Sequence, residues 1–122
     1  MFSIDELNKV MRMDVPRHKV VPFHPAHLFM CELNEFDRKN IELFDEYREY
    51  LQTYAEHGHA FTAIGDEDVY AMFGLWELWP GVGEAWLIPS AKIDRKTIAM
   101  HRAALRFFEY AANKMQIKRL QF

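Results

Sequence analysis

Three basic residues, Lys92, Arg95 and Lys96, stand between a short apolar run and a long amphipathic segment. The run at residues 84–88 predicts a strand that stops at a Pro-Ser pair, and the amphipathic segment predicts a helix. Backbone N–H groups at a helix start attract phosphates. The basic residues oppose the positive end of the helix dipole, so a bound anion would relieve an unfavourable arrangement. The sequence therefore predicts a site for a phosphate-bearing ligand here, with solvated surface charges as the alternative.

Two glutamates in the preceding apolar stretch are candidates for proton transfer. Glu77 and Glu84 are each flanked by apolar residues, an environment that raises the pKa of a carboxyl group toward neutrality. A carboxylate with a raised pKa can accept a proton from a reacting group, so either residue is a candidate general base. The alternative is that both are carboxylates at a strand edge or on a solvent-exposed face.

The tryptophans and the single cysteine have both a chemical and a structural interpretation. Trp76, Trp79 and Trp86 could stack on an adenine or line an acceptor pocket, but we expect at least two of the three to fill a core. Cys31 lies in an apolar stretch and is interpreted as a buried small hydrophobe, with a catalytic thiol as the alternative.

The six histidines do not form a recognisable metal motif. His24 and His27 lie at a predicted helix start, and His57 and His59 span a helix end and a strand start. Neither pair has cysteine or carboxylate partners at the spacing of a zinc site. We therefore expect no metal, with His24 acting as a helix cap.

Length and composition predict one globular domain with a real core. The chain has 122 residues, of which 50% are hydrophobic, and a net charge of −3, which argues against nucleic-acid binding by bulk electrostatics. A single cysteine fits a reducing compartment, and neither a secretory signal nor a membrane-spanning run is seen. We expect a cytoplasmic protein with no membrane partner.

Charge is unevenly distributed along the chain. Residues 31–68 hold eleven acidic and three basic residues, whereas residues 92–119 hold eight basic and two acidic ones. Two solvated helix faces of opposite sign that face each other would explain this asymmetry. The alternative is that the basic half of the chain binds an anion.

Capping signals and breakers define the first elements. Ser3 and Glu6 form a capping box, in which Ser3 accepts a backbone N–H and Glu6 reaches back. Residues 1–14 are thus predicted as a helical extension of the single domain, and residues 15–23 as a strand between prolines.

Two helices are predicted next. Pro25 opens the first, whose buried side should carry Leu28, Phe29 and Leu33. Asn40 caps the second, which ends near Gly58. Its apolar positions recur every three or four residues and are Ile41, Phe44, Tyr47, Leu51 and Tyr54.

The second half predicts an antiparallel meander followed by a crossover helix. Strands are expected at residues 59–64, 69–79 and 84–88, with the second apolar on both faces as a central strand should be. The helix after Ile93 has an expected buried face of Ile98, Leu105, Phe108, Ala112 and Met115, flanked by Ala104, Phe107 and Ala111. It leads to a strand at residues 118–122, which should run parallel to residues 84–88. The predicted class is α/β, with a mixed sheet flanked by helices.

Three motifs in order resemble the GNAT (GCN5-related N-acetyltransferase) superfamily, and more closely the small GNAT-like proteins of phages and prophages. Residues 33–41, Leu-Asn-Glu-Phe-Asp-Arg-Lys-Asn-Ile, resemble that group's "L-R-E-x-D-R-x-E-V" helix. Residues 70–75 are similar to its "A-M-F-G" strand, and residues 84–90 to its "W-L-I-x-S" strand end. The likeness covers roughly residues 15–122.

This resemblance implies a GNAT-like fold that uses acetyl-CoA as a substrate and transfers its acetyl group directly to an unknown amine. It implies that Trp86, Leu87 and Ile88 offer backbone groups to the pantetheine arm. The pyrophosphate would then meet Ser90, Ala91 and the basic residues of the helix start, Lys92, Arg95 and Lys96. Glu84 or Glu77 would act as base through water.

The chain also departs from the family pattern. Residues 90–95 lack the glycine-rich "Q/R-x-x-G-x-G/A" loop, which hinders close backbone approach to a pyrophosphate. The family continues past the last strand with a helix and a hairpin, so the resemblance implies a C-terminally truncated member. We expect dimerisation through the open strand edge at residues 118–122, or instability. The alternative function is a non-enzymatic phage assembly or structural protein with virion partners, on a degenerate GNAT fold.

Overall fold

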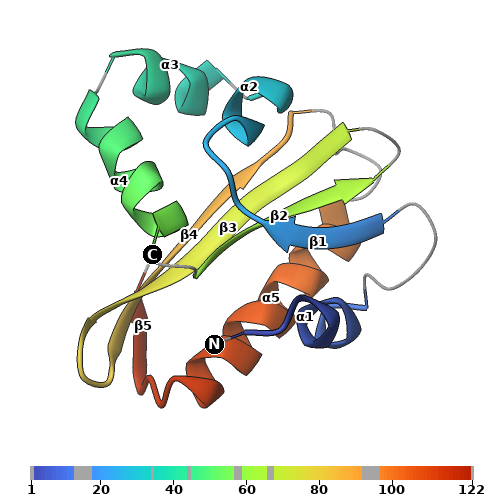
Figure 1. Cartoon of the computed structure of the whole chain (residues 1–122), viewed down its shortest axis with the longest axis vertical. Helices are drawn as coiled ribbons and strands as arrows, with labels where there is room; N and C mark the ends of the chain where they lie inside the picture. Colours follow the sequence, from blue (N-terminus) through green and yellow to red (C-terminus); the bar gives the residue numbers. More distant parts are fainter. Residues whose placement is uncertain are drawn as a thin grey trace.

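A five-stranded sheet forms the centre of the computed structural model, with helices on both of its faces (Figure 1). The strands lie side by side in sequence order: β1 (His18–Pro22), β2 (Ala60–Gly65), β3 (Asp68–Trp79), β4 (Val82–Pro89) and β5 (Arg119–Gln121). The first four pair antiparallel, and β5 pairs parallel to β4. The predicted mixed sheet with a central antiparallel meander is thus confirmed.

The structure describes residues 2–12, 18–33, 35–43, 45–56, 59–65, 68–91 and 97–121. Five helices lie within these ranges: α1 (Ile4–Val10), α2 (His27–Met30), α3 (Glu35–Leu43), α4 (Asp45–Glu56) and α5 (Thr97–Lys114). In these parts of the chain, no helix has the length and apolar character needed to cross a bilayer.

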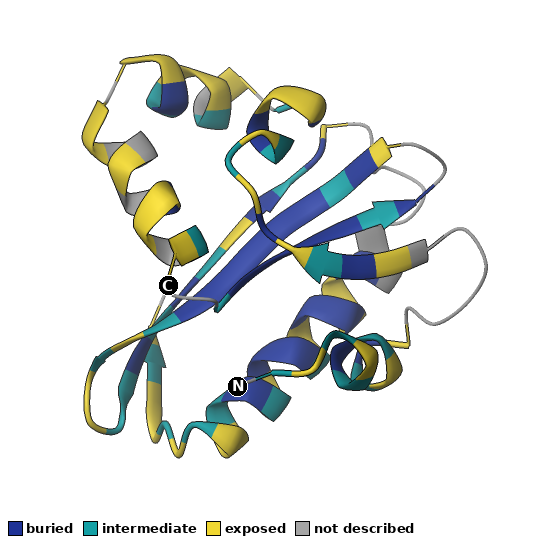
Figure 2. Ribbon diagram, in the orientation of Figure 1, coloured by how far each residue is buried: buried dark blue, intermediate teal, exposed yellow. Residues whose placement is uncertain are grey.

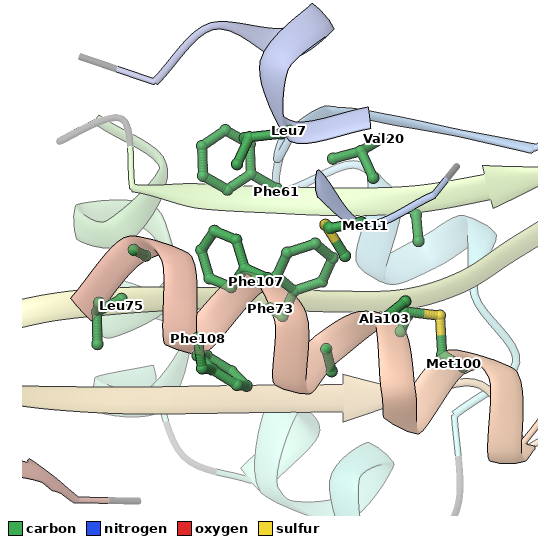
Figure 3. Close-up of a cluster of buried hydrophobic side chains, with 14 of the residues drawn as sticks. Leu7, Met11, Val20, Phe61, Phe73, Leu75, Met100, Ala103, Phe107 and Phe108 are labelled. Carbon is green, nitrogen blue, oxygen red and sulfur yellow. The ribbon is translucent and has the colours of Figure 1, made fainter. Parts of the chain in front are cut away.

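The central strand β3 supplies apolar side chains to both faces of the sheet. Ala71, Phe73 and Leu75 join the cluster under α1 and α5, which also contains Phe107 of α5 (Figure 3). Met72 belongs to the second cluster, which α2, α3 and α4 cover. Figure 2 shows the resulting buried band along the middle of the sheet. The prediction of a two-sided central strand is confirmed, and burial of these side chains is what holds the layers together.

Helix α1 is integrated into the sheet through its side chains. Ser3 accepts the backbone N–H of Glu6 at 3.4 Å, as the capping box predicts. The Asn8 amide satisfies both backbone groups of Val20 on the edge strand β1, accepting its N–H at 2.7 Å and donating to its carbonyl at 3.2 Å. An edge strand with satisfied backbone groups does not recruit other chains, so α1 protects this edge.

The C-terminal part of α5 holds the other side of α1. The Tyr110 hydroxyl donates to the Glu6 carboxylate, and Lys114 Nζ lies 3.4 Å from the same carboxylate. These contacts lower the pKa of Glu6, the hydrogen bond from Tyr110 having the largest effect. Glu6 therefore binds α5, whereas the capping box predicted that it would reach back to the helix start.

Four helix predictions were wrong in detail. Asn40 does not cap a helix, because it lies inside α3, and two helices replace the single one expected over residues 41–58. Phe29 is 85% exposed and Leu105 is 52% exposed, although both were placed on buried faces. The buried stripe of α5 instead runs through Ala104, Phe107 and Ala111, a modest rotation about the helix axis. The helix predictions also involve five residues whose position or side chain lies outside what the structure describes. They are Phe44, Tyr47, Tyr54, Gly58 and Ile98.

The oppositely charged segments do not face each other. The acidic helices α3 and α4 cover one face of the sheet, and the basic helix α5 covers the other (Figure 1). The sheet therefore separates the two charged surfaces.

Candidate functional site at the open edge of β4

Strand β4 is paired along its whole length at one edge, but over a short stretch at the other. Towards β3 it is paired from Val82 to Pro89. Towards β5, among the residues that the structure describes, the pairing covers three positions, and the last of them is Glu84 opposite Gln121. Within the described part of the chain, the edge of β4 beyond Glu84 meets no further strand until its carboxyl end.

A segment before α3 closes this edge at the carboxyl end of β4. Leu33 forms an isolated antiparallel bridge with Ser90. The N–H of Ala91 donates to the Glu32 carbonyl at 2.7 Å, and the Ser90 hydroxyl lies 3.4 Å from the same oxygen. The open part of the edge is therefore bounded at both ends, by β5 and by Leu33.

The pairing pattern determines which residue of β4 faces the open edge. The N–H of Ser90 donates to the Tyr70 carbonyl on β3 at 2.8 Å. In an antiparallel pair, backbone groups point alternately towards the partner and away from it. Ile88 and Trp86 therefore also bond to β3, and Leu87 directs its N–H and C=O away from β3, towards the open edge. An extended ligand containing amides could pair with Leu87 as a strand would.

The structure places some of the predicted donor-binding residues, and their role in binding stays a prediction. Trp86, Leu87 and Ile88 lie in β4, and Ser90 and Ala91 follow it, in an isolated bridge and a turn. The side chains of Ile88 and Ser90 are buried, and their backbone N–H groups point towards β3, so Leu87 is the member of this set that directs its backbone groups to the open edge. The basic residues Lys92, Arg95 and Lys96 lie outside the described residues, so the phosphate site remains a prediction.

The two candidate bases lie on opposite faces of the sheet. Glu84 pairs with Trp76 and Glu77 pairs with Gly83, so the two carboxylates project in opposite directions. Glu77 is exposed near the β3–β4 turn, whereas Glu84 is half-buried on the face covered by α4, at the last position paired with β5. Of the two, only Glu84 stands where the open edge begins.

Two of the three tryptophans pack against the core, as expected. Trp76 and Trp86 are partly buried against the second cluster, and Trp79 is 59% exposed. The Trp86 indole rests on Gly74, where an added Cβ would lie 2.5 Å from the indole Nε1. Phe23 contacts the same indole edge-on, with ring centroids 5.6 Å apart. The indole of Trp86 is therefore held over β3, between Gly74 and Phe23.

Cys31 and His24 have structural explanations. Cys31 is buried, and burial raises the pKa of its thiol, the opposite of what a reactive thiolate needs. The prediction that His24 caps the helix is wrong, because the N-cap residue of α2 is Ala26, which has no side-chain cap. His24 Nδ1 instead accepts the backbone N–H of Ala26 at 3.0 Å, in the turn before the helix. Among the described residues, no group of three or more potential ligands could hold a metal ion.

The sequence did not reveal how α2 is attached to the sheet. His27 Nδ1 accepts the backbone N–H of His24 at 3.1 Å and lies 2.8 Å from the hydroxyl of Thr62, which is fully buried in β2. Burial lowers the pKa of His27, and the nearby His24 adds to this effect. A threonine in an apolar strand is the only sequence signal of such a partner, and it does not identify which residue binds it.

Comparison with known proteins identifies the fold. No family model and no curated protein sequence matches the chain. Among solved structures, N-acetylglutamate synthase from Neisseria gonorrhoeae, complexed with coenzyme A and N-acetyl-glutamate, matches with a TM-score of 0.58 and 16% identity over 88% of this chain. A GCN5-related N-acetyltransferase from Kribbella flavida matches with a TM-score of 0.52 and 12% identity over 80% of this chain. The chain spans 25% and 27% of the matched chains. At these identities the likeness shows the fold, which is GNAT-like.

Proposed function

We propose that this chain binds acetyl-CoA along the open edge of β4 and transfers the acetyl group to an amine. The observation that carries the proposal is the edge itself: Leu87 presents one N–H and one C=O between the end of the β5 pairing and the Leu33–Ser90 bridge. The pantetheine arm of coenzyme A is an extended chain with two amides, and it can pair with such an edge. The CoA complex of the gonococcal structural neighbour supports this choice of donor.

Different residues near the edge would bind different parts of coenzyme A. The backbone of Trp86, Leu87 and Ile88 would line the pantetheine arm, and Leu87 would form its hydrogen bonds. Ser90, Ala91 and the basic residues that follow, Lys92, Arg95 and Lys96, would approach the pyrophosphate near the start of α5. The absence of glycine from residues 90–95 means that side-chain charge, more than backbone N–H groups, would bind the phosphates.

The reaction is direct acyl transfer. The amine nitrogen attacks the thioester carbonyl carbon, the C–S bond breaks, and the CoA sulfur leaves as a thiolate that takes up a proton. The proton lost by the amine passes through water to Glu84, which we favour over Glu77 because Glu84 is half-buried beside the edge.

Calorimetric titration with acetyl-CoA tests the proposal, with desulfo-CoA and ATP as controls. Leu87→Pro removes the edge-facing N–H, and proline is tolerated in a strand where its N–H would not be paired. Leu87→Ala, the matched control, removes the side chain but keeps the N–H. We expect Leu87→Pro to weaken binding about tenfold, the effect of one lost hydrogen bond, and Leu87→Ala to change it about twofold or less. Absence of binding at millimolar acetyl-CoA, or equal effects of both variants, would refute the proposal.

A second candidate is a non-enzymatic assembly role in a phage particle, and it is favoured by the absence of glycine from residues 90–95. In that case the same fold would recruit protein partners. The outer edge of β5 is a candidate surface, because residues 118–122 would pair with the same strand of a second copy. Light scattering tests this arrangement: a dimer that Leu120→Pro converts to a monomer supports it, and a monomer at all concentrations contradicts it.

A further inference from the structure

A glutamate and two tryptophans lie at neighbouring positions on the face of the sheet that α4 covers. Glu84 of β4 lies directly opposite Trp76 of β3, and Trp86 is two residues further along β4 on the same face. Directly opposed residues in an antiparallel pair have Cβ atoms about 5 Å apart. Trp86 rests on Gly74, which is two residues before Trp76. The side chains of Trp76, Glu84 and Trp86 therefore leave the sheet at neighbouring positions on one face.

These three residues lie where the acyl donor and the acceptor of the proposed reaction would meet. Glu84 occupies the last position paired with β5, and the open edge begins immediately after it. All three side chains are half-buried. A molecule bound against them would lie beside the acyl donor on the open edge.

The chemistry of the group favours a cation. Indole rings attract an ammonium ion through their negative faces, and a carboxylate adds direct charge pairing, which strengthens as water is excluded. Exposed carboxylates on α4, Asp45 and Glu49 among them, lie on the same side of the sheet and raise the local concentration of cations. An anionic or neutral acceptor would gain neither contribution.

We infer that Trp76, Glu84 and Trp86 form a binding site for a monovalent organic ammonium ion with an apolar chain. The inference rests on the proposed function, since it names the acceptor as a primary amine that is recognised in its charged form. The indoles would contact the alkyl chain and the ammonium group, and Glu84 would pair with the charge.

The test is a titration of the full chain without acetyl-CoA, followed by tryptophan fluorescence. The probe is n-butylamine at neutral pH, where it is protonated, and 1-butanol is its neutral counterpart. We expect saturable quenching by the amine and binding of the alcohol weaker by about tenfold. Comparable binding of both probes, or no saturation by the amine below about 0.1 M, would overturn the inference.

Variants separate the site from general surface charge. Glu84→Gln should weaken amine binding about fivefold or more, whereas Glu49→Gln, which removes the same charge from the exposed face of α4, should change it less than about twofold. Trp76→Phe should retain part of the affinity and Trp76→Leu should lose it, with circular dichroism confirming the fold of each. Equal effects of Glu84→Gln and Glu49→Gln would identify non-specific attraction and overturn the site.

The outcomes distinguish this inference from the proposed function. Amine binding without acetyl-CoA binding would leave the cation site in place and refute the donor site. Acetyl-CoA binding without amine preference would leave the proposed function in place and refute this acceptor class. If both bind, Trp76→Phe should raise the KM for n-butylamine while leaving the affinity for acetyl-CoA unchanged.

Discussion

Protonation of His27 should loosen the attachment of α2 to the sheet. The Nδ1 atom accepts the backbone N–H of His24 and lies 2.8 Å from the Thr62 hydroxyl. Since a backbone N–H can only donate, Nδ1 carries no proton in the native state, and the neutral ring holds its proton on Nε2. The protonated ring cannot accept at Nδ1, so acidification removes the bond from His24 and reverses the one with Thr62.

The direction of the pH effect follows from the pKa of His27. Burial lowers this pKa in the folded state, so the unfolded chain binds the proton more readily. The stabilising contribution is therefore complete above the ordinary histidine pKa of about 6.5, and it is lost as the pH falls from there through the folded-state pKa. One exposed and one partly buried hydrogen bond are affected, which corresponds to about 1 kcal/mol in total.

Urea unfolding of the wild type and of His27→Gln at two pH values measures this contribution. We expect the free energy of unfolding of the wild type to exceed that of His27→Gln by about 1 kcal/mol less at pH ~5 than at pH ~7.5, because the variant lacks the titrating ring. His101→Gln, which removes an exposed histidine of α5, is the control and should parallel the wild type. If His27→Gln loses as much stability on acidification as the wild type, the ring does not act as described.

Three other substitutions test the packing that positions the site. Gly74→Ala should destabilise the fold by about 2 kcal/mol or more in urea unfolding, because the new Cβ would lie 2.5 Å from the Trp86 indole and 2.7 Å from a backbone carbonyl. Asn8→Ala should cost about 1–3 kcal/mol and increase aggregation in light scattering, since it leaves both backbone groups of Val20 without their partner. Tyr110→Phe should lower the melting temperature by a few degrees, about 1 kcal/mol, through the lost hydrogen bond to α1.

Short-range patterns in the sequence were sufficient for the strands but not for the helix boundaries. The meander depends on alternation and on turn residues such as Gly81, whose φ of 85° suits glycine, and these are local signals. The boundary between α3 and α4 was missed because Asn40 is a good capping residue that here lies inside a helix. Capping preference is a weak signal when a helix on either side of the residue can bury an apolar stripe.

The candidate site shows which kind of information a sequence lacks. That Glu84 and Trp86 share a face follows from their spacing of two residues along a strand, so the sequence contained this part of the site. The register of the β3–β4 hairpin determines that Trp76 lies opposite Glu84 and that Glu77 lies on the other face from Glu84. This register shifts between Glu77 and Trp79. A shift of one residue would move a whole strand face to the other side of the sheet, so the hairpin turn decides which glutamate stands beside the indoles. The choice of Glu84 as proton acceptor and cation partner therefore rests on register, and only the folded sheet supplies it.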